Sequence, residues 1–363
     1  MADLEMSRAR YPWRVLAFDA NGVIQVLEHS GGAFEEHVVQ TWDKSDSRSL
    51  GVVAASLNDR SLAVGRRNGT VEVRDRLSGE IGPTIPPLTN ESDPFVGLHL
   101  FTKQQPGSFG SLLSCTVQGN ARIISFEVDN SSRTLLQWKV RENILCCKVD
   151  GSERVCLFGG KNEMNIWDLE YNVKSWPTKE HPIQNGKLWW TSATFLTRDN
   201  PHTFVVGTNN NQVHIYDARK KVDELSPCKI YDIESSCIKR LPNRDTAIQA
   251  IAEGEDGYTV YAGNDCGNLV SLDTRTGRVL GCFRGIDTLS IKSLAKHHEL
   301  PVIASCGDDS CLSIWDTKRQ KLQCRILVRP TIRVTNVIVD PNFFEKDGGK
   351  KGKSHKRFRS DAS

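Results

Sequence analysis

Residues Ile291 to Asp316 read IKSLAKHHELPVIASCGDDSCLSIWD, a pattern from which the fold of the whole chain can be predicted. Two short apolar segments, VIAS and LSIW, flank the polar turn Asp308-Asp309-Ser310. Residues of this kind tolerate the backbone of a tight hairpin turn, and apolar residues that alternate with polar ones favour strands. The stretch therefore predicts a β-hairpin whose second strand ends in a tryptophan followed by an acid.

The same unit recurs along the 363-residue chain. An apolar strand and a tight polar turn precede an alternating strand that ends in an acid at Glu28, Asp75, Glu127, Asp168, Asp217, Asp273 and Asp316. The spacings, about 41 to 56 residues, bracket the ~40–45 residues of a WD-repeat blade. We therefore expect an all-β protein, a seven-bladed WD40-type β-propeller over residues 13–340.

The last unit resembles the WD-repeat consensus, in which a turn Asp, a His of a preceding Gly-His pair and the strand Trp form a buried polar network. Asp309 and Trp315 match, but Ile286 follows Gly285 where the histidine is expected. We therefore expect apolar packing between blades to hold the repeats together.

Ring closure needs one more strand. The first unit supplies strands at Val15–Asp19 and Val23–Leu27, with little sequence before Trp13 for an innermost strand. The strand-like run IRVTNVIVD follows the last unit, at Ile332–Asp340. We expect it to complete the first blade, because closure removes an open sheet edge.

Positive charge is concentrated at the C-terminus. The formal net charge is +3, and Pro341–Ser363 holds seven Lys/Arg against three Asp/Glu, which leaves the first 340 residues at −1. The tail cations are Lys350, Lys351, Lys353, Lys356, Arg357 and Arg359. This composition predicts a disordered tail over 341–363 that targets the nucleus or binds RNA, a solubilising end being the alternative. Residues 1–12 are expected to be a flexible N-terminus.

Catalysis, cofactors and metals are not expected. No nucleophile elbow, phosphate-binding loop or HExxH motif occurs, and the eleven cysteines form no CxxC pair. The thiols read as small buried residues of a reducing compartment. His297-His298 is expected in a solvated turn rather than at a metal. No apolar run reaches the ~20 residues of a membrane helix, so no membrane contact is expected.

Four residues are candidates for a partner surface. Arg66, Arg67 and Lys161 fall in turns that line one face of the ring, where they would meet an acidic partner or phosphate; solvated charges are the alternative. In the pair Trp189-Trp190, side chains of adjacent strand residues point to opposite faces, so one belongs to the core. Trp190 is predicted to be the exposed one.

Four stretches are similar, in order, to the nucleolar WD-repeat family of ribosome-biogenesis factors: AVGRRNGTVEV (63–73), GGKNEMNIWDLE (159–170), DTRTGRVLGCFRG (273–285) and VIASCGDD (302–309). The resemblance implies a non-catalytic scaffold of pre-rRNA processing in nucleolar precursors of the large ribosomal subunit. It implies docking on other assembly factors, contact with rRNA, release by an AAA-type ATPase and a monomer within a larger assembly. It also implies localisation to the nucleus and nucleolus.

A second interpretation comes from two arginines. Arg219 and Arg275 each follow a strand-terminal acid by two residues, Asp217 and Asp273, in consecutive repeats. The arrangement resembles the paired WDxR boxes of substrate receptors for cullin-type ubiquitin ligases, although neither copy keeps the tryptophan.

Overall fold

The computed structural model describes residues 11–29, 37–43, 47–87, 93–103, 108–127, 129–161, 164–171, 173–177, 188–197, 200–220, 227–233, 246–283 and 289–343. Over these residues the chain forms 28 β-strands and one short 3₁₀ helix, η1 (Arg48–Leu50). The predicted flexible N-terminus and basic tail lie almost wholly outside the described residues. Both therefore stay predictions.

The strands form seven four-stranded antiparallel sheets, the blades, each of which extends from an innermost strand outward to an edge strand. Blade 1 is β28 (Val334–Val339), β1 (Trp13–Asp19), β2 (Ile24–His29) and β3 (His37–Trp42). Blade 2 is β4 (Val52–Leu57), β5 (Ser61–Arg66), β6 (Val71–Asp75) and β7 (Ile81–Ile85). Blade 3 is β8 (Phe95–Leu100), β9 (Gly110–Thr116), β10 (Asn120–Phe126) and β11 (Ser132–Lys139). Blade 4 is β12 (Ile144–Val149), β13 (Val155–Gly160), β14 (Met164–Asp168) and β15 (Val173–Pro177).

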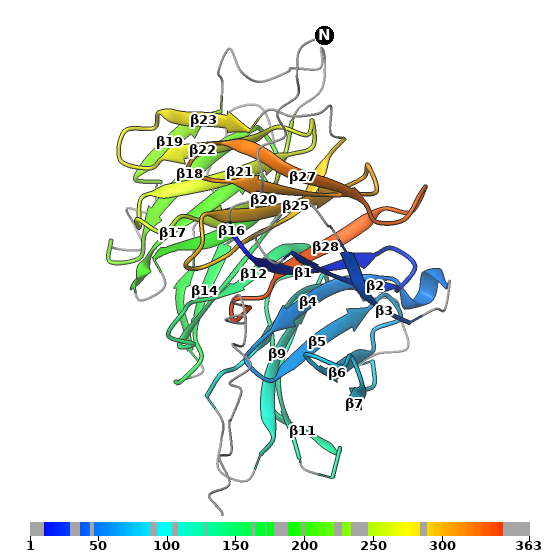
Figure 1. Ribbon diagram of the computed structural model, residues 1–363. Helices are drawn as coiled ribbons and strands as arrows, with labels where there is room; N and C mark the ends of the chain where they lie inside the picture. The colour runs from blue at the N-terminus through cyan, green and yellow to red at the C-terminus, as the bar shows by residue number, and fades with distance from the viewer. Residues whose placement is uncertain are drawn as a thin grey trace, which may run out of the picture.

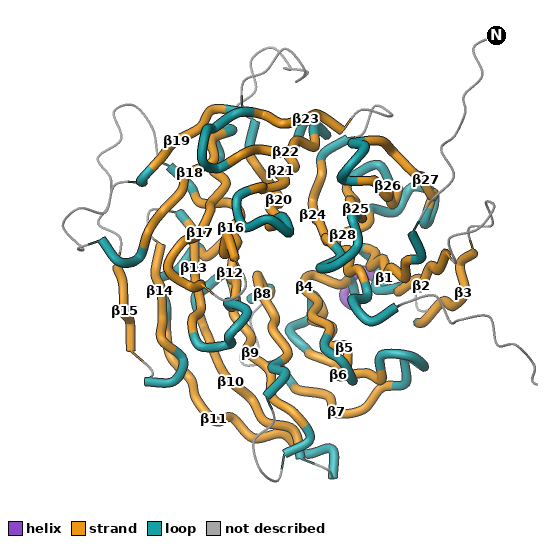
Figure 2. The backbone as a smooth tube through the Cα atoms, turned by 60° about the vertical axis from the view of Figure 1, so that its left-hand side comes forward, coloured by secondary structure: helices purple, strands orange, loops and turns teal. Residues whose placement is uncertain are grey.

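Blade 5 is β16 (Trp190–Thr197), β17 (Asn200–Thr208), β18 (Gln212–Asp217) and β19 (Lys229–Asp232). Blade 6 is β20 (Ile248–Glu253), β21 (Thr259–Asn264), β22 (Leu269–Asp273) and β23 (Val279–Phe283). Blade 7 is β24 (Ile291–Lys296), β25 (Val302–Gly307), β26 (Cys311–Asp316) and β27 (Lys321–Leu327). The innermost strands surround a common centre, so the chain is the seven-bladed β-propeller expected from its repeats (Figure 2).

The third strand of each blade is the acid-terminated strand of the repeat. The seven acids lie at the end of that strand or within one residue of it. The preceding hairpin turns use the left-handed backbone, with φ of 84° at Gly69, 59° at Asn211 and 61° at Ser310. Glycine and asparagine adopt this conformation most readily, so the turn residues of the repeat are confirmed.

The core lies between the blades. Every residue of the second strands β1, β5, β21 and β25 is buried, because each sheet is covered on both faces by its neighbours. Between blades 1 and 2, for example, Leu16 and Phe18 pack in one cluster with Leu62 and Val64. Apolar packing between blades is therefore the main stabilising contact, as expected.

Blade 7 confirms the expectation for Trp315, which is buried in the cluster between blades 6 and 7. Its indole N–H donates to Ser305 Oγ at 2.9 Å. Asp309 accepts from the backbone N–H of Cys311 and pairs with Arg325 at 2.9 Å. In place of the usual Asp–His–Trp network, Trp315 and Asp309 thus make separate polar contacts.

The C-terminal strand closes the ring. β28 pairs antiparallel with β1, with Val339 opposite Val15 and Val337 opposite Ala17. In Figure 1 the orange-red β28 runs beside the blue β1, so the two ends of the described chain share one sheet. The expected closure of the first blade by Ile332–Asp340 is confirmed.

Candidate functional site

The ring has two faces that offer turns to a partner. Face A is defined as the face of the turns joining second to third strands, such as Arg67-Asn68-Gly69. Face B is defined as the face of the turns joining third to fourth strands, such as Asp217-Ala218-Arg219. Because the sheets are antiparallel meanders, each face repeats seven times around the ring. A partner that docks on either face can therefore contact several blades at once.

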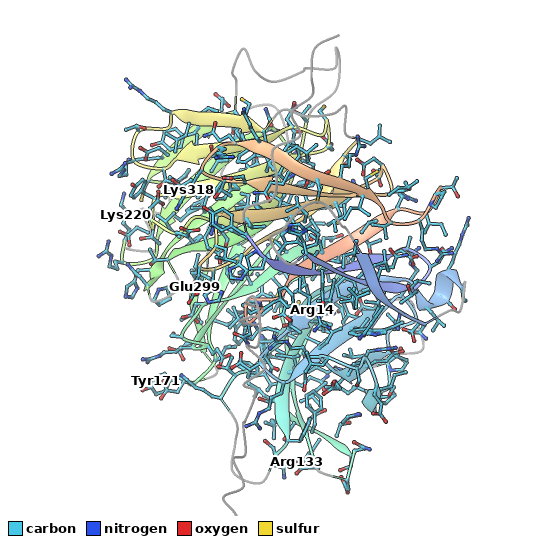
Figure 3. The ribbon with its side chains drawn as sticks, in the orientation of Figure 1. Arg14, Arg133, Tyr171, Lys220, Glu299 and Lys318 are labelled. Carbon is cyan, nitrogen blue, oxygen red and sulfur yellow. The ribbon has the colours of Figure 1, made fainter. Side chains whose placement is uncertain are left out.

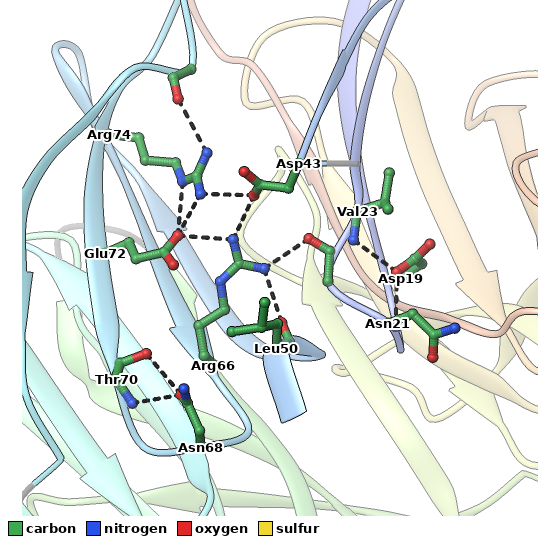
Figure 4. A network of polar contacts seen from close by, with 12 residues as sticks. Asp19, Asn21, Val23, Asp43, Leu50, Arg66, Asn68, Thr70, Glu72 and Arg74 are labelled. Atoms are coloured by element: carbon green, nitrogen blue, oxygen red, sulfur yellow. Dashed lines mark hydrogen bonds and ion pairs between the residues drawn. The ribbon is translucent and has the colours of Figure 1, made fainter. Parts of the chain in front are cut away.

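Arg66 is not a surface residue, so the prediction that it faces a partner is wrong. It is the last residue of the buried strand β5, and its side chain is 2% exposed. Its guanidinium pairs with Asp43 at 2.6 Å and with Glu72 at 2.8 Å (Figure 4). It also donates to the carbonyl oxygens of Gly22 and Leu50, at 2.8 and 2.9 Å. Arg66 is therefore an internal clamp between blades 1 and 2.

A second guanidinium completes this network. Arg74 pairs with Asp43 at 2.7 Å and with Glu72 at 2.5 Å. Burial opposes the charge of Glu72, but hydrogen bonds and ion pairs with Arg66 and Arg74 lower the pKa of this carboxyl. Burial likewise acts to lower the pKa of Arg66, and its contacts with Glu72 and Asp43 raise it instead. The four charged groups are paired with one another inside the fold, and only the Nε of Arg66 is buried without a hydrogen-bond partner.

Arg67 and Lys161 do lie in turns of face A. Arg67 is exposed, and its backbone N–H donates to the carbonyl oxygen of Gly51 at 2.8 Å. Lys161 is half-buried and belongs to the turn of blade 4. Since Arg67 belongs to blade 2, one whole blade separates the two residues. Of the three basic residues predicted for this face, only Arg67 and Lys161 thus lie in its turns, and they are not neighbours.

The Lys161 ammonium group sits over the ring of Trp189, 4.3 Å from its centroid. Trp189 is half-buried and forms an isolated β-bridge with Lys161. Asn209 holds the backbone of Trp189 in place by accepting from its N–H at 2.9 Å and donating to its carbonyl at 3.1 Å. The indole, held at its backbone by Asn209 and covered by the Lys161 ammonium group, is an ordered amphipathic point on face A, and tryptophan is among the residues enriched at protein interfaces.

Trp190 belongs to the core, so its predicted exposure is wrong. It is 2% exposed and packs in the cluster between blades 4 and 5. Its indole N–H donates to the hydroxyl of Tyr216 at 3.3 Å, and Tyr216 stacks on Phe204. The alternation argument that places one member of the pair in the core holds. The more exposed member is Trp189, which is half-buried.

The paired arginines of face B fold back onto their own turns. Arg219 binds both oxygens of Asp217 at 2.9 and 2.6 Å, and Arg275 binds those of Asp273 at 3.2 and 3.1 Å. Hydrogen bonds from Arg219 lower the pKa of Asp217 to about 2, and those from Arg275 lower the pKa of Asp273 to about 2. Both arginine side chains remain more than half exposed. Both arginines are therefore held in place by their own turns and are open to a partner on face B.

The pair His297-His298 lies in a turn between β24 and β25, as expected, and His298 is exposed there, but His297 is not. It is 1% exposed, and its Nδ1 accepts from the backbone N–H groups of Glu299 and Leu300 at 3.2 and 3.0 Å. The buried His297 side chain thus stabilises the turn between β24 and β25 through hydrogen bonds to its backbone and is not exposed to solvent. Within the described ranges, no three His, Cys, Asp or Glu side chains are grouped as metal ligands, and no helix is long and apolar enough to span a bilayer.

No protein-family model matches the sequence. Among curated proteins, the chain is 28% identical over 220 residues to WD repeat-containing protein 74 of Mus musculus and 29% identical over 220 residues to that of Homo sapiens. These alignments cover 56% of this chain and 52% and 51% of the relatives. The chain therefore spans about half the length of these curated relatives.

Two further proteins support the fold. A WD repeat-containing protein of Dictyostelium discoideum is 23% identical over 326 residues, which is 87% of this chain and 59% of that protein. The crystal structure of Chaetomium thermophilum Raptor superposes with a TM-score of 0.63 at 14% identity, over 76% of this chain and 24% of that chain. The second likeness shows the fold alone. The chain is a propeller of the WD-repeat type that resembles WD repeat-containing protein 74.

Proposed function

We propose that this WD-repeat propeller is a non-catalytic scaffold in the assembly of the large ribosomal subunit, acting in nucleolar precursor particles where pre-rRNA is processed. The observation that carries the proposal is the sequence similarity to WD repeat-containing protein 74. The four stretches that resemble the nucleolar ribosome-biogenesis family support the same proposal. Other assembly factors are the proposed direct partners, and an AAA-type ATPase is the proposed agent of release.

The geometry supports a scaffold in two ways. The ring is stiff, because closure by β28 ties its first and last strands into one sheet. The buried cluster of Arg66 with Glu72 and Asp43 is used for internal ion pairing. The stacked pair of Lys161 and Trp189 on face A is the proposed point of docking on a protein partner. The tail cations Lys350, Lys351, Lys353, Lys356, Arg357 and Arg359 are proposed to direct the chain to the nucleolus, with contact to rRNA.

Affinity purification of the tagged full-length chain tests this proposal. We expect large-subunit pre-rRNA and assembly factors in the purified material, with the RNA-dependent part lost after RNase treatment. A chain ending at Phe344 should keep protein partners and lose nucleolar accumulation. Recovery of a cullin adaptor without ribosomal RNA would instead identify a ubiquitin-ligase substrate receptor.

A further inference from the structure

Basic side chains line face B over three consecutive blades. The turns after the third strands read Asp217-Ala-Arg-Lys in blade 5, Asp273-Thr-Arg-Thr-Gly-Arg in blade 6 and Asp316-Thr-Lys-Arg-Gln-Lys in blade 7. With the first residue of β19 they present eight exposed cations, which we call the basic rim: Arg219, Lys220, Lys229, Arg275, Arg278, Lys318, Arg319 and Lys321.

Contacts between blades join these turns into one surface. From blade 5, Lys229 Nζ donates to the carbonyl oxygen of Arg275 in the turn of blade 6, at 2.6 Å. From the turn of blade 7, Gln320 Nε2 donates to the carbonyl oxygen of Leu280 in blade 6, at 3.4 Å. Figure 3 labels Lys220 of blade 5 and Lys318 of blade 7 on the same side of the molecule. The basic rim is therefore continuous across the three blades.

The acids of these turns are directed inward. Asp217, Asp273 and Asp316 accept from the backbone N–H groups two residues later, at 3.0, 2.8 and 2.9 Å. Asp217 and Asp273 are further neutralised by the arginines of their own turns. Among the residues that the structure describes, Arg278, Lys318, Arg319 and Lys321 form no ion pair. These three turns thus present positive charge to solvent. The neighbouring turns between first and second strands carry the exposed acids Glu255, Asp256 and Glu299, of which Glu255 pairs with Lys296 at 2.6 Å.

The repeat itself does not require this charge. The equivalent positions of blade 3 hold Glu127 and Asp129, and those of blade 4 hold Asp168 and Glu170. The first 340 residues have a net charge of −1. The ring is therefore close to neutral as a whole but polarised around face B, and such a polarised surface steers a partner of opposite charge.

We propose that the basic rim binds the phosphodiester backbone of RNA. This inference rests on the proposed function and deepens it, because it gives the ring an RNA contact separate from the tail. Cations spaced along an arc of three blades suit a chain of regularly spaced phosphates. Arg275 adds a flat surface, since its guanidinium lies 3.6 Å from the centroid of the Tyr258 ring while the side chain remains 61% exposed. Unpaired bases stack on such planes, which favours RNA over an acidic peptide.

Charge reversal in the full-length chain tests the basic rim. The rim variant carries Arg278→Glu, Lys318→Glu and Arg319→Glu. The matched control carries Arg133→Glu, Arg141→Glu and Arg333→Glu, three exposed cations outside the basic rim, with the same change in net charge. Binding is measured by fluorescence anisotropy, over a salt series, to a uridine oligonucleotide of about 20 nucleotides and to an RNA duplex of the same length.

We expect the rim variant to lose affinity for at least one RNA by about tenfold or more, and its salt slope to flatten by about 2 on the single strand. The control should bind like the wild type, because the tail is unchanged in both. Thermal melting verifies that each variant is folded. Should the reversal variant fail to fold, the neutral set Arg278→Gln, Lys318→Gln and Arg319→Gln replaces it, with the same expected direction.

Two outcomes would overturn the proposal. One is a folded rim variant whose affinity and salt slope for both RNAs match those of the wild type. The other is a glutamate peptide of equal net charge that binds as tightly as RNA and loses binding in the rim variant, which would identify an acidic protein as the partner. The proposed function is tested separately, by identifying the particles that co-purify with the chain. The proposed function fails by itself if the chain is absent from large-subunit precursors while the basic rim still binds RNA.

Discussion

The carboxylate of Asp340 accepts two hydrogen bonds from the guanidinium of Arg76, at 2.6 and 3.0 Å, although 264 residues separate them in sequence. Asp340 directly follows the closing strand β28, and Arg76 follows the third strand of blade 2. Both side chains are buried, at 1% and 10% exposure. This pair fastens the C-terminal end of the ring to the neighbouring blade.

Replacement of Asp340 by Asn should therefore weaken the fold. The change leaves the buried Arg76 charge without its partner, and loss of one member of a buried pair costs about 3–5 kcal/mol. Denaturant unfolding monitored by tryptophan fluorescence measures the loss. Asp59→Asn is the matched control, because its contact with Asn342 is exposed. Equal losses in the two variants would show that the buried pair has no special role.

Removal of the closing strand should have a larger effect. A chain that stops at Pro330 loses the burial of Val334, Val337 and Val339 against blades 1 and 7, worth ~1.5–3 kcal/mol for each side chain. The sum rivals a typical total stability of ~5–15 kcal/mol. We expect this truncation to be insoluble or to melt without cooperativity, whereas a chain ending at Phe344 melts like the full chain. Cooperative melting of the shorter chain near the full-length temperature would refute closure by β28.

Variants of the two adjacent tryptophans should distinguish a loss of folding stability from a loss of partner docking. Trp190→Ala removes a buried ring between blades and should cost about 3–5 kcal/mol, as should Trp315→Ala. Trp189→Ala should cost less, because this ring is half-buried, and should reduce the recovery of protein partners through loss of the stack with Lys161. Calorimetry and partner pull-downs measure the two effects. The docking assignment fails if partner recovery with Trp189→Ala equals that of the wild type.

His297 should make stability depend on pH. Burial, followed by the positive charges of His298 and Lys296, lowers the pKa of His297 from its ordinary value. The unfolded chain then takes up a proton at about pH 6.5, while the folded chain does so only at lower pH. The contribution of His297 is thus complete above this pH and is lost as pH falls toward the folded pKa. His297→Gln should remove that part of the slope.

The measurement is the free energy of unfolding on both sides of the ordinary histidine pKa. His202→Gln serves as a control, because that side chain is exposed. If the slope of the His297→Gln variant matched that of the control, His297 would not be a source of the pH dependence.

The repeat predicts the fold because its signals are local. A turn residue that tolerates positive φ, such as Asn211, and an acid after an alternating strand mark each blade without knowledge of its neighbours. The closing strand was predictable from a missing partner in the first blade. The paired arginines were visible as well, but not their bidentate contacts with Asp217 and Asp273.

Surface assignments failed where neighbouring blades decide exposure. Arg66 reads as a turn residue, yet it ends a second strand, and second strands are covered on both faces. Trp190 and Trp189 are equivalent by alternation alone, and only the position of blade 4 decides which ring is buried. The basic rim is scattered over about 100 residues of sequence, and ring geometry brings its turns together. A run of Lys or Arg after the strand-terminal acid in successive repeats is the signal that would have revealed it.

Whether this propeller serves assembly of the large ribosomal subunit is decided by depletion of the protein followed by sedimentation of ribosomal subunits. We expect a fall in free large subunits relative to small ones, with accumulation of large-subunit precursor RNA and recovery on re-expression of the full chain. An unchanged subunit ratio and unchanged precursor RNA after verified depletion would contradict the proposed role.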